Sequence, residues 1–283
     1  MSRNRDRLGT SSPQDNSPPQ QALQENPGFA FVVPTEFVEL PSGGRFYSEN
    51  HPLHGQSTIE IKQMTAKEED ILTSRTLLKN GVAIDRVIQS LITDKRVNSD
   101  SLLVGDRNAI LIAARVSGYG NDYNTTVNCP ACAASQEYSF DLNNAHIHTG
   151  NDDSALSLTS NGDGTFTTTL PRTRVEVTFR LLNGNDEKAM VSQAENARKR
   201  NRPEQSVTSQ IRSMVVSVNG DESSQALNYL IDNVPSLDAR HLRACYKAAA
   251  PNVDLTQFFS CEECGHEQEM EVPLTADFFW PDR

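Results

Sequence analysis

Two pairs of cysteines constrain this 283-residue chain more than any other feature. The pairs are Cys129 and Cys132, separated by Pro-Ala, and Cys261 and Cys264, separated by Glu-Glu. A CxxC turn directs two thiolates at one point, and two such turns complete a tetrahedral shell of four sulfurs. Paired motifs of this kind usually lie ~15–20 residues apart, whereas residues 133–260 separate these two. Spacing alone therefore does not prove one shared site.

The residues that follow each cysteine pair match in register. A Gln-Glu dipeptide begins four residues after the second cysteine of each pair, at Gln136 and at Gln268. Apolar residues follow at matching positions in both halves, and each half ends on a leucine ten residues after its last cysteine. Each half therefore predicts a strand, a cysteine turn and a second strand. Two such halves facing each other make a zinc ribbon, with halves at 124–142 and 256–283.

Four cysteines in two pairs are also compatible with other chemistry. The five cysteines stand in a chain whose N-terminus lacks the apolar core of a signal peptide, so we expect a reducing compartment, which disfavours disulfides. A thioredoxin-like redox pair needs its CxxC at the start of a helix, whereas alternating, strand-like residues follow both pairs here. An iron–sulfur cluster uses four thiolates as well. Zinc is the default, because it fits a structural four-sulfur shell. We predict one zinc per chain, held by Cys129, Cys132, Cys261 and Cys264.

The fifth cysteine, Cys245, follows His241 by four residues, so the two share one face of a predicted helix. They are either a ligand pair, an activated thiol or part of a core face. The core is favoured, because Leu237, Ala244 and Ala248 are expected on the same face. Three histidines are the remaining candidate ligands. His266 is assigned to a position beside the filled four-cysteine shell, and His146 and His148 are assigned to a surface loop.

The chain is predicted to be an α+β protein with five segments. Residues 1–28 are rich in Pro, Gln, Ser and Asn and predict a disordered N-terminal arm that folding does not require. A strand lead-in and a helical block are predicted at 29–123, the first half of the ribbon at 124–142, and an inserted α+β region at 143–255. The second half of the ribbon and an aromatic tail fill 256–283.

Local signals place several elements within these segments. Thr65 and Glu68 form a capping box, and apolar residues at helical spacing from Ile84 to Ile92 form one stripe. Residues 110–114 are apolar all round, which predicts a buried helix. Residues 161–164 predict a hairpin turn, and alternation over 175–181 predicts a half-buried strand. Three further helix starts are predicted at polar residues: Asp106, Asn185 with Asp186, and Ser236.

Charge and missing motifs narrow the function. The chain carries 26 Lys and Arg against 37 Asp and Glu, a net charge of -11, which argues against binding to duplex nucleic acid. The one basic cluster, residues 198–202, is assigned to a solvated helix end, where the helix dipole favours cations. No apolar run approaches the ~18 residues of a membrane span. No P-loop, nucleophile elbow or zinc-protease motif occurs, so the sequence does not indicate an enzyme.

Ordered landmarks along residues 38–283 resemble the T-even-type bacteriophage baseplate protein family. These landmarks include residues 40–47 (LPSGGRFY), 64–72 (MTAKEEDIL), 102–107 (LLVGDR), 115–120 (RVSGYG) and 278–281 (FFWP). The resemblance implies a structural or assembly component of a contractile-tail baseplate hub and no enzymatic activity. It also implies other tail and baseplate proteins as partners, and a place in the virion tail after assembly in the host cytoplasm. A hub subunit and a wedge-side adaptor are both compatible with it.

Two questions stay open at this stage. The alternative function is a zinc-ribbon nucleic-acid-binding factor, although the ribbon strands carry acidic residues and no Lys or Arg. The C-terminal aromatics Phe278, Phe279 and Trp280 either pack on the chain's own fold or anchor it in a neighbouring subunit. The N-terminal arm is a second candidate anchor.

Overall fold

A computed structural model describes residues 32–79, 81–150, 153–203, 205–272 and 276–279. The predicted arm at 1–28 and the proposed anchor Trp280 lie outside the described residues. Helices and strands are both abundant, as expected for an α+β protein. The chain divides after Val33, and the described residues of the larger unit begin at Pro34.

The first part of the larger unit is an antiparallel strand pair followed by helices. Its elements, in chain order, are β1 (Thr35–Glu39), β2 (Thr58–Lys62), α1 (Ala66–Thr73), α2 (Arg75–Lys79), α3 (Ala83–Leu91), the 3₁₀ turn η1 (Ser99–Ser101) and α4 (Val104–Tyr119). The capping box of Thr65 and Glu68 at the start of α1 is confirmed. The apolar stripe is confirmed in α3, where Val87, Ile88 and Leu91 are fully buried.

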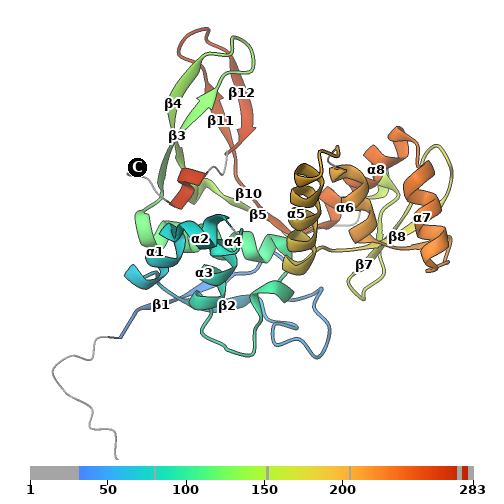
Figure 1. The fold of residues 1–283 in the computed structure, drawn as a ribbon, viewed down its shortest axis with the longest axis horizontal. Coiled ribbons are helices and arrows are strands. Elements are labelled where there is room, and N and C mark those ends of the chain that lie inside the picture. The colour runs from blue at the N-terminus through green and yellow to red at the C-terminus, as the bar shows by residue number, and fades with distance from the viewer. Residues whose placement is uncertain (1–31, 80, 151–152, 204, 273–275, 280–283) are drawn as a thin grey trace, which may run out of the picture. The chain divides into compact units, whose positions relative to one another are not determined.

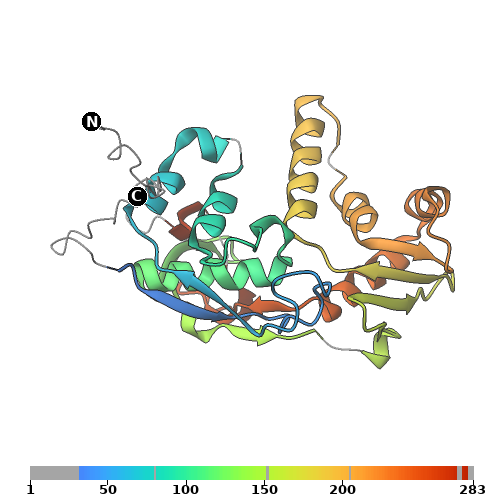
Figure 2. The ribbon, with the colours of Figure 1, turned by 90° about the horizontal axis from the view of Figure 1, so that it is seen from below.

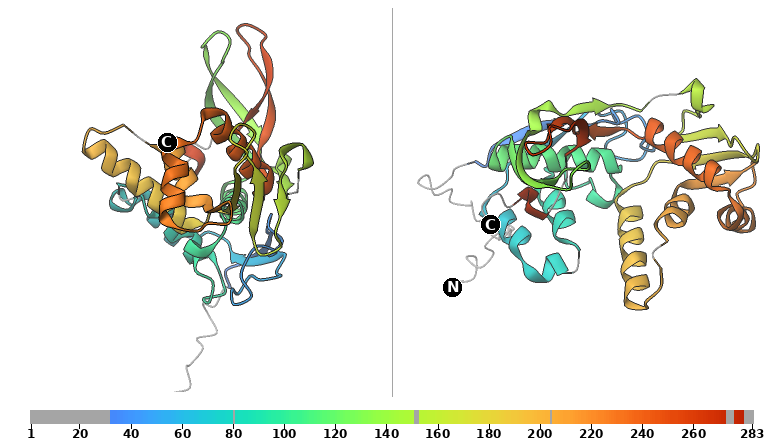
Figure 3. Two further views of the ribbon diagram at one scale, coloured as in Figure 1. Left: turned by 90° about the vertical axis from the view of Figure 1, so that its right-hand side faces the viewer. Right: turned by 90° about the horizontal axis from the view of Figure 1, so that it is seen from above.

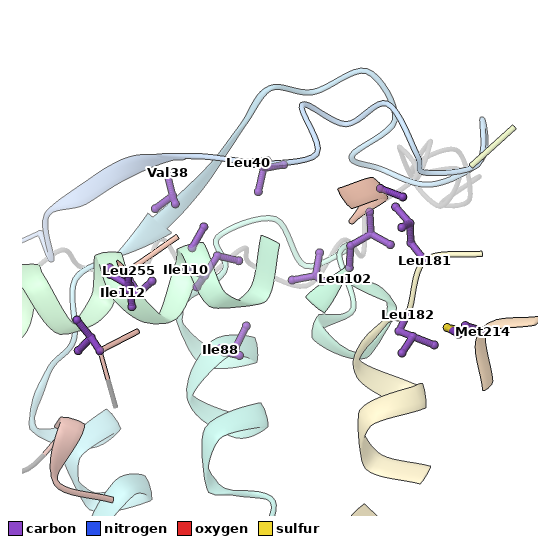
Figure 4. Close-up of a cluster of buried hydrophobic side chains, with 14 of the residues drawn as sticks. Val38, Leu40, Ile88, Leu102, Ile110, Ile112, Leu181, Leu182, Met214 and Leu255 are labelled. Atoms are coloured by element: carbon purple, nitrogen blue, oxygen red, sulfur yellow. The ribbon is translucent and has the colours of Figure 1, made fainter. Parts of the chain in front are cut away.

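α4 is the central helix, and its burial follows the prediction only in part, because Leu111 and Ala113 are half-buried. Ile110 and Ala114 are almost completely buried and Ile112 nearly so. Figure 4 shows side chains from β1, α3 and α4 in one cluster with Leu181, Leu182 and Met214, which come from the later part of the chain. The core is therefore continuous between the helical block and the region that follows it in sequence.

Two β-hairpins carry the cysteine pairs. β3 (Asp122–Asn128) pairs with β4 (Ser135–Asp141), and β11 (Thr256–Ser260) pairs with β12 (Glu267–Glu271), both antiparallel. Their registers correspond, since Val127 lies opposite Gln136 in the first hairpin and Phe259 lies opposite Gln268 in the second. The predicted repeat of strand, turn and strand is thus confirmed. The two hairpins stand side by side (Figure 1; Figure 3, left).

A four-stranded antiparallel sheet with flanking helices lies between the two hairpins in sequence. The sheet has the order β6-β7-β8-β9. Its elements and neighbours are η2 (Leu142–Asn144), β5 (His146–His148), η3 (Ser154–Leu156), β6 (Thr159–Ser160), β7 (Thr165–Thr169), β8 (Glu176–Arg180), α5 (Gly184–Lys199), α6 (Ser206–Met214), β9 (Val215–Val218), α7 (Ser224–Asn233), α8 (Ser236–Ala249) and β10 (Asn252–Asp254). In Figure 2, α5 points away from the sheet and the chain returns to it through α6.

The strands at the two ends of this inserted region, β5 and β10, pair with each other. β5 and β10 form a two-stranded antiparallel sheet, in which His148 lies opposite Asn252. Residues about a hundred positions apart in sequence are therefore neighbours, and the stretch between them leaves and returns at one place. Within it, the predicted turn at 161–164 joins β6 to β7, and Val177 and Phe179 are the buried residues of β8, as the alternation predicted.

Three predicted helix starts are wrong in detail. Leu103, not Asp106, is the N-cap of α4, because Asp106 turns inward to distant partners. Asn183 caps α5, and Asp186 completes a capping box from the third position of the helix. Pro235 precedes α8, so Ser236 is its first helical residue. In each case the N-cap lies earlier in the sequence than the polar residue that was predicted to start the helix.

The inward partners of Asp106 explain its position. Its carboxylate accepts hydrogen bonds from the Ser42 N–H at 3.0 Å, the Ser42 hydroxyl at 2.6 Å and the Tyr47 hydroxyl at 2.7 Å. The Tyr47 oxygen in turn accepts from the N–H of Leu103 at 3.0 Å. Burial raises the pKa of Asp106, and these three donors oppose that shift. The loop at 40–47 is thereby fixed to the start of α4.

Candidate metal centre

The first cysteine turn is a closed loop between β3 and β4. The N–H of Cys129 donates to the carbonyl of Ala134 at 2.8 Å, and the N–H of Ala133 donates back to the carbonyl of Cys129 at 2.8 Å. Ala133 takes a left-handed conformation with φ of 60°. This backbone reversal brings Cys129 and Cys132 to the same side of the turn.

The second turn repeats the first bond for bond. The N–H of Cys261 donates to the carbonyl of His266 at 2.9 Å, and the N–H of Gly265 donates to the carbonyl of Cys261 at 2.9 Å. Gly265 has φ of 65°, at the position that Ala133 occupies in the first turn. Glycine adopts this conformation without the steric cost that alanine bears. The sequence repeat is therefore a repeat of backbone geometry.

The four predicted ligands come together, although 128 residues separate the pairs. The Sγ atoms of Cys129, Cys132, Cys261 and Cys264 all lie within 4.8 Å of one another. The Cys129–Cys264 and Cys132–Cys261 sulfur distances are 3.7 and 3.8 Å. A tetrahedral zinc–thiolate shell with bonds of ~2.3 Å has sulfur–sulfur edges of ~3.8 Å, whereas a disulfide needs ~2.05 Å. The four cysteines could hold a metal ion, and their spacing fits a tetrahedral one.

Burial differs within each pair in the same way. Cys129 and Cys261, the first cysteines, are buried, and Cys132 and Cys264 are exposed. The sulfur cluster therefore has a covered side toward the hairpins and an open side toward solvent. A metal ion would have a route of entry along the exposed cysteines without unfolding of the hairpins.

The pKa values of the thiols differ within the cluster. The N–H groups of Cys132 and Ala131 lower the pKa of Cys129 to about 6, against opposing desolvation. For Cys264, the N–H of His266 lowers the pKa, but the neighbouring thiol groups and burial outweigh it and raise the pKa to about 12. One thiolate thus forms readily, while further negative charge is resisted. A bound divalent cation would supply the charge that lets all four ionise.

Glutamine side chains bridge the two hairpins at both ends, Gln136 beside the cysteine turns and Gln257 at the strand ends away from them. Gln136 on β4 donates to the carbonyl of Ser260 at 3.3 Å and accepts from the N–H of Glu262 at 3.1 Å. Gln257 on β11 donates to the carbonyl of Asp141 at 2.8 Å and accepts from its N–H at 3.2 Å. The sequence marked Gln136 only as part of the repeat and missed Gln257, because an interstrand amide bridge leaves no local pattern.

Aromatic rings fill the space between the hairpins. The Tyr138 ring packs at 4.9 Å from Phe140 and at 5.2 Å from Phe259. The Tyr138 hydroxyl also donates to the carbonyl of Phe258 at 3.1 Å. The hairpins therefore have an apolar core of their own beneath the cysteine turns, and the sulfur cluster lies at its end.

The C-terminal aromatics lie against the same chain. Phe278 and Phe279 in η4 (Ala276–Phe279) are 4% and 5% exposed. Phe278 meets Tyr123 edge-on at 5.3 Å, and its carbonyl accepts a 2.6 Å hydrogen bond from the buried Arg115. Of the two predicted alternatives for these two rings, the structure has packing on the chain's own fold.

Cys245 is a core residue, as predicted, but two of the three residues predicted to share its face are not buried; the third, Ala248, is half-buried and packs against the core. Leu237 is 55% exposed and Ala244 is exposed; the buried side of α8 runs instead through Ala239, Leu242 and Cys245. The Cys245 sulfur contacts the Thr168 hydroxyl and the His241 Nε2, both at 3.4 Å. Burial raises the pKa of Cys245, so the thiol stays protonated and covered. This environment does not activate a nucleophile.

Among the residues that the structure describes, the other candidate ligands do not belong to a cluster of metal-binding side chains. His266 Nε2 is 3.4 Å from the Gln268 side chain, and His148 Nε2 is 2.9 Å from the carbonyl of Ala248. His146 is exposed on β5. The basic residues 198–202 lie at the C-terminal end of α5, as predicted. A cavity of about 600 Å³ lies between α5 and α6, and none of its lining residues belongs to the cysteine hairpins.

The fold and the site together define an α+β protein in which two hairpins bring four cysteine thiols together in a cluster that could hold a metal ion. The chain belongs to the family described as T4 bacteriophage base plate protein, whose model matches residues 33–280. Searches of the curated proteins and of the solved structures give no match. None of the helices in the described part of the chain has the length and apolar character to cross a bilayer.

Proposed function

We propose that this chain is a structural or assembly component of a contractile-tail baseplate, at the hub or next to it. It acts through contacts with other tail proteins and not through catalysis. The observation that carries this proposal is the family match over residues 33–280, which includes the helical block, both hairpins and the region between them. Cys245, whose sulfur lies 3.4 Å from His241 Nε2, supports a non-catalytic role, because burial raises its pKa and so disfavours a reactive thiolate.

We further propose that the two hairpins form a zinc ribbon with one zinc per chain. Cys129, Cys132, Cys261 and Cys264 are its ligands, two from each hairpin. The sulfur separations of 3.7 and 3.8 Å support a tetrahedral ion. The ion would act as a fixed junction between chain segments that are 128 residues apart. Structural zinc sites supply ~10–16 kcal/mol of apparent folding free energy in small zinc-binding peptides.

Elemental analysis of the purified full-length protein tests the metal. We expect about one zinc per chain, lost in Cys261→Ser together with a large drop in the unfolding temperature. Cys245→Ala is the matched control, because it removes a cysteine outside the cluster; its zinc content stays unchanged. A folded wild-type protein without metal would contradict the zinc proposal. Iron with inorganic sulfide in place of zinc would show that the four cysteines hold an iron–sulfur cluster.

Complementation tests the baseplate role separately. A phage that lacks this protein is grown in cells that supply either the wild-type chain or Cys261→Ser, and the tails are examined by electron microscopy. We expect normal baseplates only with the wild-type chain. Complete baseplates without any copy of the chain would refute the proposal, whatever the metal content.

A nucleic-acid-binding ribbon is distinguished by a direct assay. The exposed residues of the hairpin strands include Glu137, Glu267, Glu269 and Glu271, which would repel a phosphate backbone. We therefore expect no shift of duplex DNA by the full-length protein at low salt. Tight, salt-sensitive binding would favour the nucleic-acid alternative.

A further inference from the structure

A groove lies along β1, on the side of the strand opposite β2. Glu36, Phe37, Val38 and Glu39 form one wall, α4 forms the floor through residues such as Ile112, and η2, β5 and β10 form the far wall. The cavity is about 370 Å³, and no residue of β2 lines it. We call this surface the β1 groove.

The edge of β1 that faces away from β2 has open backbone groups. The bonds from Gln63 N–H to Pro34 and from Leu40 N–H to Ser57 fix the alternation, so Glu36 and Val38 bond to β2. In an antiparallel pair the intervening residues point the other way. Thr35, Phe37 and Glu39 therefore direct their N–H and C=O groups away from β2, and in the described chain no strand other than β2 pairs with β1.

The groove also exposes apolar side chains that a protein surface normally covers. Phe37 is 73% exposed, and Ile147 on the far wall is 40% exposed. Exposed edge strands are usually protected by lysine, proline or a bulge. β1 has the sequence Thr-Glu-Phe-Val-Glu and pairs with β2 without a shift in register, so it has no lysine, proline or bulge, and its charged residues are the two glutamates, Glu36 and Glu39.

The ionisable side chains that line the groove are acidic. The Oε1 atom of Glu36 is buried and has no hydrogen-bond partner among the described residues. Glu39 adds a second carboxylate, and no lysine, arginine or histidine lines the cavity. A buried carboxylate oxygen without a donor is costly, and a positive side chain would relieve that cost. The chemistry of the groove therefore calls for an extended, partly apolar and basic ligand.

We propose that the β1 groove receives an extended segment of a partner protein, which adds as a strand to the open edge of β1 and places a lysine or arginine against Glu36. Main-chain hydrogen bonds to Phe37 and Glu39 supply affinity, and the apolar walls and Glu36 supply specificity, as in other cases of strand addition. This inference goes beyond the baseplate role and does not involve the cysteine cluster.

Selection from a library of random twelve-residue peptides on the full-length protein tests the proposal. We expect the selected peptides to alternate apolar residues with positions that include lysine or arginine. A selected peptide is then added to the ¹⁵N-labelled protein, and amide hydrogen exchange is followed by NMR. The amides of Phe37 and Glu39 should exchange at least tenfold more slowly with peptide bound. Those of Glu36 and Val38, which point toward β2, should change little.

Matched variants test the role of charge. Glu36→Gln should weaken binding of the basic peptide at least tenfold, and replacing the basic residue of the peptide by norleucine should have the same effect. Glu176→Gln, at the exposed first position of β8, is the control and should leave binding unchanged. Cooperative thermal unfolding of Glu36→Gln at or above the wild-type temperature shows that the variant is folded.

Three results would overturn the proposal. Peptides that bind without protecting Phe37 and Glu39 would show groove filling without strand addition. The absence of any selected peptide would show that the edge is not a docking site. Concentration-dependent dimers of the wild-type protein that disappear in Phe37→Asp would identify a second copy of this chain as the occupant.

Discussion

Arg115 joins the helical block, the first hairpin and the C-terminal turn, and its loss should be costly. The side chain is 1% exposed and donates to three carbonyl oxygens: Phe278 at 2.6 Å, Gly120 at 2.7 Å and Asp122 at 3.1 Å. Burial lowers the pKa of Arg115, which shows that desolvation of the cation opposes these bonds. A replacement with methionine keeps much of the stem volume and removes the charge and all three bonds.

The magnitude follows from these opposing effects. A hydrogen bond to a charged group contributes ~1.5–3 kcal/mol, so three of them amount to roughly 4.5–9 kcal/mol. The desolvation cost that Met avoids is several kcal/mol. We therefore expect Arg115→Met to lower the free energy of unfolding by about 2–4 kcal/mol.

Urea unfolding at neutral pH measures this difference, and limited proteolysis locates it. The C-terminal residues of Arg115→Met should become sensitive to protease, because the carbonyl of Phe278 loses its donor. Arg96→Met is the control: the Arg96 side chain is 80% exposed and pairs with Asp94 on the surface, so we expect the free energy of unfolding to stay almost unchanged. A loss below 1 kcal/mol in Arg115→Met, or an unchanged proteolytic pattern, would refute the reasoning.

Three further predictions concern single groups. Tyr47→Phe removes the hydroxyl that bonds Asp106 and Leu103, so we expect a loss of about 2–4 kcal/mol in urea unfolding; a loss under 1 kcal/mol would contradict the network. Ala133→Gly relieves a left-handed alanine, whose strain of ~1–2 kcal/mol exceeds the ~0.4–1 kcal/mol of added unfolded-state entropy, so the metal-loaded protein should unfold at a slightly higher temperature, and no gain would argue against the strain. Burial raises the pKa of Glu68, but hydrogen bonds from Lys62, Ser90 and Thr65 outweigh it and lower the pKa to about 2. This stabilisation is complete above the ordinary value of 4.5 and is lost as pH falls toward 2; in Glu68→Gln the stability measured by urea unfolding should depend less on pH in that window, and an unchanged dependence would refute the assignment.

The hairpins and several local elements could be predicted from the sequence because their signals are short-range. The matched residues after each CxxC reflect pairing between strands that are adjacent in sequence, such as Val127 with Gln136, and the stripe in α3 reflects one helix face. The buried roles of Asp106 and Arg115 could not be predicted. Ser42 lies 64 residues from Asp106, and Phe278 lies 163 residues from Arg115. No local pattern encodes partners so distant, so Asp106 was assigned to the nearest role its residue type favours, a helix cap.

The difference between short-range signals and long-range contacts also explains which features of the cysteine site could be predicted. Their convergence was inferred from the repeat, since 128 intervening residues carry no spacing rule. Gln257, which bridges the hairpins, has no counterpart in the matched register and was missed. For α8, the predicted face included Leu237 and Ala244, because their apolar character at nearby positions resembles a core stripe. The helix instead turns Ala239 and Leu242 inward.

The pairing of β5 with β10 changes the entropy of bringing the cysteine turns together. Without it, closing the sulfur cluster would join the ends of a 128-residue loop. Once His148 and Asn252 lie opposite each other, the path from one cysteine turn to the other shortens to roughly 25 residues, which reduces the loop-closure cost by about 1.4 kcal/mol. A chain in which the intervening sheet and helices fold first would present its four thiols to a metal at a higher effective concentration. Assembly of the site then depends on a segment that contributes no ligand to it.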